Sequence, residues 1–169
     1  PGMQAWRGYD KKKMFITNDY NFQTGTVHES RINLNVHTGT HIDAPFHVLE
    51  DGARIESIPV ERLVGPALVI DLTEVETSIG REHLEPHAIR KGDWVVLKTK
   101  DSFNDSGEFD RSFVFLNAEG AAYLRDLGIN GVAIDALGIE RDQPGYPTHK
   151  TLFNADILIV EGVRLKDVP

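Results

Sequence analysis

The chain has 169 residues, of which 40% are hydrophobic and 26% are charged, and its formal net charge is −8. These values are typical of one soluble globular domain whose core is stable without disulfides or structural metals, so we expect a single domain over residues 1–169. The acidic charge argues against nucleic acid or an anionic membrane as the main partner, because both require a basic surface.

The first predicted strand covers residues 31–36, where apolar and polar side chains alternate along the chain. A period of two matches the geometry of a strand, in which successive side chains point to opposite faces. We therefore expect a strand with one apolar face and one face in contact with water.

The next segment, residues 37–47, favours an extended strand over a helix up to Asp43. Two threonines flank Gly39, and Pro45 follows soon after, so the local composition disfavours a helix. Because Pro45 cannot donate to a β-ladder, we expect the strand to end there and His47 to follow on a turn.

This segment contains the strongest candidates for metal ligation. In an extended chain, residues two apart point to the same side, so His37, His41 and Asp43 would share one face. Gly39 lies on that face and has no side chain to obstruct an ion. Two imidazoles and a carboxylate are typical of a catalytic divalent metal, and three protein ligands leave a position open for water. Such a metal lowers the pKa of bound water to about 7.

Four later apolar runs predict strands buried on both faces, because each is short, rich in β-branched residues and bounded by Gly, Asp or Pro. These runs are residues 66–72, 93–99, 131–135 and 156–161. The polar segment 100–111 between them predicts a long loop. Asn117 and Gly128 are suited to begin and end a helix, and a shorter helix is predicted at residues 148–154.

Three residues in the second half of the chain are weaker candidates for the site. His149 lies at the start of the shorter helix, and Glu161 closes an apolar strand, where burial is costly unless the carboxylate is paired or bound to metal. Exposure at the strand end explains Glu161 nearly as well, and it is the better explanation for Asp135. The spacing of these residues along the sequence does not by itself show that they lie near His37, His41 and Asp43.

Several other kinds of chemistry are excluded by what the sequence lacks. There is no cysteine, hence no disulfide, no thiolate metal site and no cysteine nucleophile. The nucleophile elbow, the phosphate-binding loop and the dinucleotide fingerprint are absent. Without a signal peptide or an apolar run of about 20 residues, a cytoplasmic protein outside the membrane is expected.

The run H-T-G-T-H-I-D-A-P-F-H at residues 37–47 resembles the H-x-G-T-H-x-D-x-P-x-H signature of the cyclase superfamily, which includes bacterial kynurenine formamidases and isatin hydrolases. Further similar segments are Leu97-Lys98-Thr99, residues 131–135, His149 with Leu152, and Val160-Glu161-Gly162. The resemblance implies an α/β fold of the swivelling β/β/α type, one domain with a mixed central sheet. Family members have further residues at both ends, so we expect some to be missing here.

Carried over by position, the resemblance implies a ligand set for zinc or manganese. His37, His41 and Asp43 would hold a first ion. Asp43 would bridge to a second ion held by His149 and Glu161, and whether one or two ions bind stays open. The partners implied are a small amide substrate and further copies of the chain, as a homodimer or homotetramer.

Two further roles follow from the resemblance. His47 would be the general acid/base, and Trp6 would contact the substrate, although Gln4 and Arg7 replace two prolines of the family's M-P-x-(W/Y)-P-G segment. The formamidases also carry D-T-P-S where this chain has residues 135–138, Asp-Ala-Leu-Gly, so the substrate itself stays open.

The implied reaction is metal-dependent hydrolysis of an amide bond in a small substrate such as an N-formyl aryl amide. The general acid/base would accept the proton of water and return it to the leaving nitrogen. Alternatives are a hydrolase that opens cyclic amides or imides, a non-catalytic metal-binding protein, and a binding module without metal. Phe103, Phe109, Phe113 and Trp6 suit either an aromatic pocket or the core.

Overall fold

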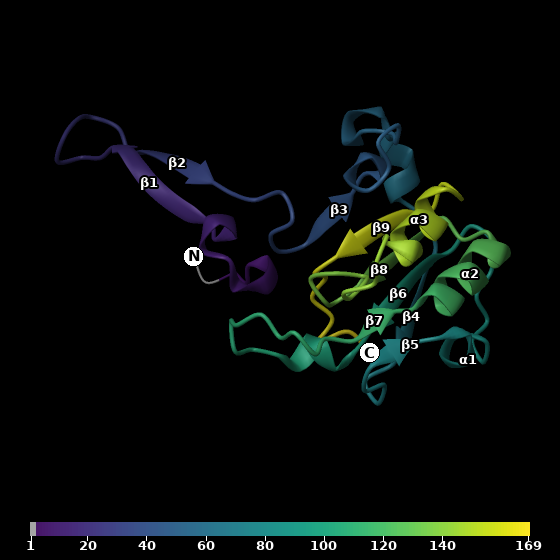
Figure 1. Ribbon diagram of the computed structural model, residues 1–169. Coiled ribbons are helices and arrows are strands. Elements are labelled where there is room, and N and C mark those ends of the chain that lie inside the picture. Colours follow the sequence, from purple (N-terminus) through teal and green to yellow (C-terminus); the bar gives the residue numbers. More distant parts are fainter. Residues whose placement is uncertain (1–2) are drawn as a thin grey trace.

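The computed structural model describes residues 3–169, and its centre is a five-stranded sheet (Figure 1). Its strands, in spatial order, are β3 (His41–Asp43), β9 (Leu158–Glu161), β8 (Gly131–Ile134), β6 (Trp94–Lys98) and β4 (Ala67–Asp71). The last four are parallel to one another, and β3 is antiparallel to β9. The expected α/β class with a mixed central sheet is confirmed.

The burial of the strands follows their position in this order. β8 is buried along its whole length and β6 along most of it, as expected for inner strands of a parallel sheet. The prediction of burial on both faces is wrong for β4, where Ala67 and Asp71 are exposed. β4 is the edge strand and pairs only with β6, so part of its surface meets solvent.

Within residues 3–169, three α-helices accompany the sheet, namely α1 (Arg81–Leu84), α2 (Ala118–Leu127) and α3 (Pro147–Phe153). The predicted ends of α2 are confirmed, since the Asn117 side chain accepts the Gly120 N–H and Gly128 adopts φ 69°. α2 and α3 pack against each other beside the sheet (Figure 1), and Leu124 and Leu152 reach the core. None of the helices in residues 3–169 is long and apolar enough to cross a membrane.

Short elements fill the connections between these strands and helices. β5 (Ser78–Ile79) and β7 (Phe115–Leu116) form a small parallel pair. The 3-10 turns are Trp6–Gly8, Asp10–Lys12, Pro45–His47, Ile55–Ser57, Val60–Leu63 and Lys100–Phe103. The last of them begins the predicted loop at residues 100–111, which is otherwise irregular.

A hairpin formed by β1 (Phe15–Tyr20) and β2 (Glu29–Asn33) projects away from the central sheet (Figure 1), and we call residues 15–33 the arm. The strand predicted at residues 31–36 therefore exists but ends at Asn33. Every residue of both strands is exposed, so the expectation of one apolar, covered face is wrong for this chain. No other element in residues 3–169 covers either side of the arm.

Candidate metal centre

Residues 37–43 do not form one extended strand, contrary to the sequence-based prediction. Only His41–Asp43 is β3, and the chain turns before it at Gly39, whose φ of 69° lies in the left-handed region that glycine adopts without strain. This turn folds His37 back against His41, with His37 Nδ1 3.1 Å from His41 Nε2. Alternation along β3 places His41 and Asp43 on one face, as predicted, and the turn rather than an extended strand adds His37.

The turn is held against the end of β9. The Thr40 hydroxyl donates to the carbonyl of Gly162 over 2.8 Å. Gly162 has φ 67°, and a Cβ there would lie 2.6 Å from the carbonyl oxygen of Gly39. Backbone therefore meets backbone directly at Gly162, which leaves no room for a Cβ, while Gly39 is favoured by its positive φ.

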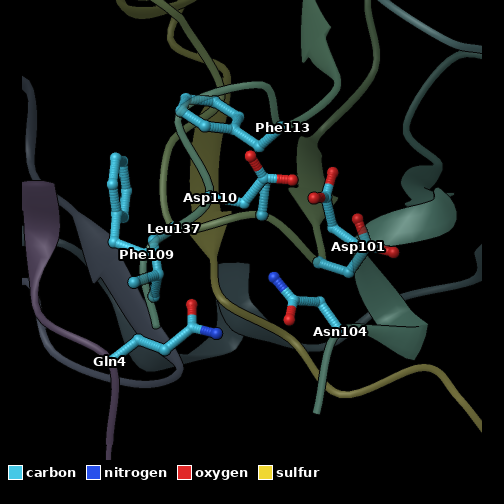
Figure 2. A pocket seen from close by; sticks show the side chains of 9 residues that line it. Gln4, Asp101, Asn104, Phe109, Asp110, Phe113 and Leu137 are labelled. Carbon is cyan, nitrogen blue, oxygen red and sulfur yellow. The ribbon is translucent and has the colours of Figure 1, made fainter. Parts of the chain in front are cut away.

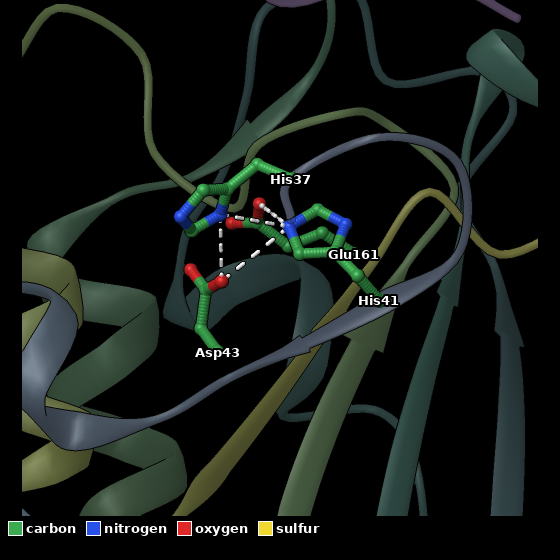
Figure 3. Close-up of side chains that lie close together, drawn as sticks. All are labelled: His37, His41, Asp43 and Glu161. Atoms are coloured by element: carbon green, nitrogen blue, oxygen red, sulfur yellow. Dashed lines mark hydrogen bonds and ion pairs between the residues drawn. The ribbon is translucent and has the colours of Figure 1, made fainter. Parts of the chain in front are cut away.

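The pairing of β3 with β9 adds the fourth side chain. His41 lies directly opposite Glu161 in the antiparallel register, and its Nε2 is 3.4 Å from Glu161 Oε2. Figure 3 shows His37, His41, Asp43 and Glu161 directed toward one another. Glu161 is buried, and its Oε1 accepts the Ile139 N–H over 2.6 Å. The explanation of Glu161 as an exposed strand end is wrong.

Two more histidines approach Asp43 from other elements. α3 carries His149, whose Nε2 is 3.7 Å from Asp43 Oδ2 and 3.6 Å from Glu161 Oε1. The 3-10 turn Pro45–His47 places His47 Nε2 3.9 Å from the same Asp43 oxygen. Asp43 thus belongs to two groups that could each hold an ion. The first contains His37, His41, Asp43 and Glu161, and the second contains Asp43, His47 and His149.

The cluster is closed at its base and open on one side. The side chain of Asp43 is 1% exposed and that of His149 7%, whereas His37 is 24% and His47 38% exposed. A small molecule can therefore approach the cluster from the side of His37 and His47.

The donor set and the state of Asp43 fit a divalent cation. Neither carboxylate oxygen of this buried residue accepts a hydrogen bond among residues 3–169, although imidazole nitrogens lie near both, and a buried carboxylate is costly unless positive charge compensates it. His37 Nδ1 lies 2.9 Å and His41 Nε2 3.4 Å from Asp43 Oδ1. Ligands placed about 2.0–2.2 Å from a tetrahedral ion are separated by roughly 3.3–3.6 Å, which is close to these spacings.

The charges of the cluster favour positive charge at its centre. Burial lowers the pKa of His41, but contacts with Asp43 and Glu161 outweigh it and raise the pKa to about 10. Burial also lowers the pKa of His149, but its contacts with carboxylates outweigh burial and raise that pKa to about 11. These carboxylates belong to Asp43, Glu140 and Glu161. Burial raises the pKa of Asp43, yet its imidazole neighbours hold that pKa well below the usual range. Metal binding replaces such protons, so these acceptors suit a cation.

The pKa of His47 shifts in the direction opposite to those of His41 and His149. Burial lowers the pKa of His47 below its ordinary value, and the neighbouring His37 and His149 act in the same direction against the attraction of Asp43. The neutral imidazole is therefore favoured, which is the form that accepts a proton.

Sequence reasoning missed Glu140, which precedes α3. This residue is 5% exposed and accepts the backbone N–H groups of Thr148 and His149. Its Oε2 also lies 2.6 Å from His149 Nδ1. No motif signals this contact, because it joins a loop to a helix through the fold.

Asp135 lies outside the cluster and has a structural partner. Its carboxylate accepts hydrogen bonds from the backbone and hydroxyl groups of Thr99 and Ser102. These bonds fasten the start of the loop after β6 to the end of β8. Asp135 is therefore neither a simple exposed strand end nor a member of the candidate metal centre.

Trp6 packs against aromatic side chains rather than against the histidines. Its ring centroid is 5.0 Å from that of Phe109 and 5.8 Å from that of the buried Phe113, both in edge contacts. A Cβ on Gly138 would lie 2.6 Å from the indole. The glycine found where formamidases carry serine therefore leaves the space that Trp6 occupies, and contact of Trp6 with substrate stays a prediction.

Phe109 and Phe113 do not together enclose an aryl pocket, although Phe109 also lines an open hollow of about 320 Å³ with residues such as Arg7 and Lys13. Phe109 and Phe113 line a cavity of about 30 Å³ together with polar side chains that include Asp101 and Asp110 (Figure 2). That volume suits a water molecule and is too small for an aromatic ring. Phe103 is 51% exposed and lies outside the lining of this cavity.

Comparison with known proteins agrees with the fold. The Cyclase family model matches residues 1–141. A kynurenine formamidase of Bacillus cereus (strain ATCC 14579) is 34% identical over 147 residues, which cover 86% of this chain and 69% of that protein. The chain belongs to the cyclase family.

Solved structures share the same architecture. A structure described as a predicted metal-dependent hydrolase from Bacillus stearothermophilus has a TM-score of 0.87 and 50% identity, covering 99% of this chain and 80% of that one. Isatin hydrolase A from Labrenzia aggregata has a TM-score of 0.79 and 23% identity, covering 93% of this chain and 73% of that one. The latter similarity concerns the fold alone.

Proposed function

We propose that this chain hydrolyses an N-formyl aryl amide with water activated by a divalent metal. It is a metal-dependent hydrolase of non-peptide carbon–nitrogen bonds, in agreement with its kynurenine formamidase and metal-dependent hydrolase relatives. The observation that carries the proposal is the convergence of histidines and Glu161 around Asp43, whose buried oxygens accept no hydrogen bond among residues 3–169.

The proposed ligands divide between two ions that share Asp43. His37 and His41 belong with its Oδ1, from which they lie 2.9 and 3.4 Å. His149 would hold a second ion on the Oδ2 side together with Glu161, which also belongs to the first group through Oε2 and so would contact both ions. Imidazole and carboxylate ligands suit Zn²⁺ and Mn²⁺ alike, and we propose one of these two metals.

His47 is proposed as the general acid/base. A metal bound in the cluster polarises a carbonyl and lowers the pKa of water toward 7. Nε2 of His47 faces the cluster from its open side and is neutral by preference, so it can accept the proton of water. The resulting imidazolium can return that proton to the leaving nitrogen, which is a poor leaving group without protonation.

The site is tested first by metal content, measured by elemental analysis of protein supplied with Zn²⁺ or Mn²⁺. We expect one to two equivalents in the unchanged chain and loss of metal in His41→Ala. The exposed His87 provides a control, since His87→Ala removes an imidazole outside the cluster and should retain metal. Protein that stays metal-free with both ions supplied contradicts the proposal.

The reaction is tested with the same preparations on N-formylkynurenine and on isatin. Turnover of the formamide, together with a loss of about 10²–10⁴-fold in His47→Ala at unchanged metal content, is the expected result. Opening of isatin alone would replace the formamide by a cyclic amide as the substrate class. Full activity of His47→Ala would contradict its role.

Three wider properties belong to the same proposal. We propose a homodimer or homotetramer in which a second copy covers the arm, because a lone two-stranded hairpin is at best marginally stable in water. The arm is also nearly neutral, while the rest of the chain carries the negative charge. A cytoplasmic location and a single domain over residues 1–169 stay predictions, and cell fractionation and limited proteolysis test them.

A further inference from the structure

The carboxylate of Glu140 is buried beside the candidate metal centre without belonging to either group of possible ligands. Oε1 accepts the Thr148 N–H over 3.1 Å, and Oε2 accepts the His149 N–H over 3.2 Å. The same Oε2 lies 2.6 Å from Nδ1 of the His149 ring. Glu140 therefore contacts both the backbone N–H and the ring of His149.

These contacts determine which ring nitrogen of His149 carries hydrogen. An ionised carboxylate only accepts hydrogen bonds, so the short contact requires a hydrogen on Nδ1. Nε2 faces Asp43 Oδ2 and Glu161 Oε1 at 3.7 and 3.6 Å, and its lone pair becomes available where a cation replaces the Nε2 proton. The two backbone bonds fix the carboxylate relative to α3, so the ring is held in one orientation.

We infer that Glu140 is a positioning residue that holds His149 with hydrogen on Nδ1 and presents Nε2 to the ion bridged by Asp43. The inference rests on the proposed function, because it presumes that His149 is a ligand. Metal-bound histidines commonly donate their second N–H to a carboxylate, and loss of that partner typically lowers metal affinity 10–100-fold.

Glu140→Gln tests this role with nearly unchanged shape. The amide keeps one oxygen, so its NH₂ faces either the Thr148 N–H or both N–H donors of His149, and in neither orientation does a charged acceptor hold the hydrogen on Nδ1. A neutral acceptor favours hydrogen on Nδ1 less strongly than the carboxylate does, so Nε2 is less available to a metal. We expect the affinity for one of two zinc ions to fall about 10–100-fold, measured by competition with a chromophoric chelator.

A purely structural role for Glu140 in α3 predicts a different pattern, and Thr148→Val is the matched control. This change removes a buried hydrogen bond of the same helical turn, from the Thr148 hydroxyl to the Leu116 carbonyl, and leaves Glu140 and His149 intact. We expect Thr148→Val to lower the denaturation midpoint while zinc affinity stays unchanged. Equal losses of zinc affinity in Thr148→Val and Glu140→Gln would overturn the inference.

The wild-type protein decides the question if Glu140→Gln does not fold. In the zinc-loaded chain, ¹⁵N NMR should show His149 with zinc on Nε2 and a hydrogen-bonded proton on Nδ1. Zinc on Nδ1, or two tightly bound ions at unchanged affinity in Glu140→Gln, would overturn the inference and leave the proposed hydrolase standing. A wild-type chain that binds no zinc or manganese would overturn both.

Discussion

Asp43 is the residue on which both groups of possible ligands depend, because each group uses one of its oxygens. Its position follows from β3, a strand of three residues paired with β9. At the same scale, two residues outside the cluster, Gly138 and Asp101, have surroundings that predict measurable effects of substitution on stability.

Gly138→Ala should displace the Trp6 indole, because the added Cβ would lie 2.6 Å from its ring. Overpacking of this kind costs about 1–3 kcal/mol of unfolding free energy, measured by urea denaturation. Gly25→Ala is the control, since a Cβ there meets no heavy atom of residues 3–169 within 4 Å. Trp6→Phe in the Gly138→Ala background should restore part of the loss, and an additive double variant would contradict the proposed clash.

Asp101→Asn should change the pH dependence of stability. Burial raises the pKa of Asp101 above 3.8, and the nearby Asp135 and Asp110 add to the rise. The folded chain therefore holds this proton more tightly than the unfolded chain, and its ionisation lowers stability as the pH rises from 3.8 through the folded pKa. Asparagine removes this cost and keeps an oxygen for the Val114 N–H.

The measurement is urea unfolding of Asp101→Asn and of the unchanged chain at several values from about pH 4 to about pH 7. We expect the variant to gain stability relative to the unchanged chain as the pH rises. A difference that is independent of pH, or that falls with rising pH, would show that the carboxylate is not destabilised in the fold.

At the scale of elements, the site depends on the contact between the turn before β3 and the end of β9. Gly162→Ala should be destabilising for two reasons. Alanine adopts a φ of 67° only with strain, and its Cβ would lie 2.6 Å from the carbonyl oxygen of Gly39. Gly92→Ala provides a matched control, because its φ is 85° but its Cβ would meet no heavy atom of residues 3–169 within 4 Å.

We expect both variants to lose about 1–3 kcal/mol from the left-handed backbone, and Gly162→Ala to lose more than Gly92→Ala. Only Gly162→Ala should also weaken metal binding, because its neighbour Glu161 and the turn carrying His37 would shift. Denaturation and zinc competition measure the two effects. Equal metal affinity in both variants would contradict the dependence of the site on this contact.

At the scale of the whole molecule, the arm is the feature that an isolated chain leaves uncovered. Ile16 and Ile32 face each other across the hairpin and are 45% and 61% exposed. Burial of one such side chain contributes about 1.5–3 kcal/mol. A second copy that covers the arm would remove this apolar surface from water.

Ile32→Glu should therefore weaken self-association at least about tenfold, measured by light scattering over a range of protein concentrations. Lys91→Gln changes the net charge equally at an exposed position outside the arm and should leave association unchanged. A monomeric unchanged chain, or an Ile32→Glu variant that associates as before, would contradict the proposed role of the arm.

The local patterns predicted most of the elements because they depend on nearby residues alone. Apolar runs located the parallel strands of the sheet, and Asn117 with Gly128 marked both ends of α2. The arm was predicted only in part, since the alternation at residues 31–36 indicates a strand but not its partner. Whether anything covers such a strand depends on the rest of the molecule and on other copies.

The sequence alone singled out the main candidate ligands, because metal ligation requires particular donor atoms and the run at residues 37–47 concentrates them. The tertiary structure decided how they meet. The turn at Gly39 brings His37 to His41, and the β3–β9 register brings Glu161 opposite His41. It also placed the Glu140 carboxylate against the His149 ring, because the irregular segment before α3 folds back, and no periodic pattern in the chain signals that turn.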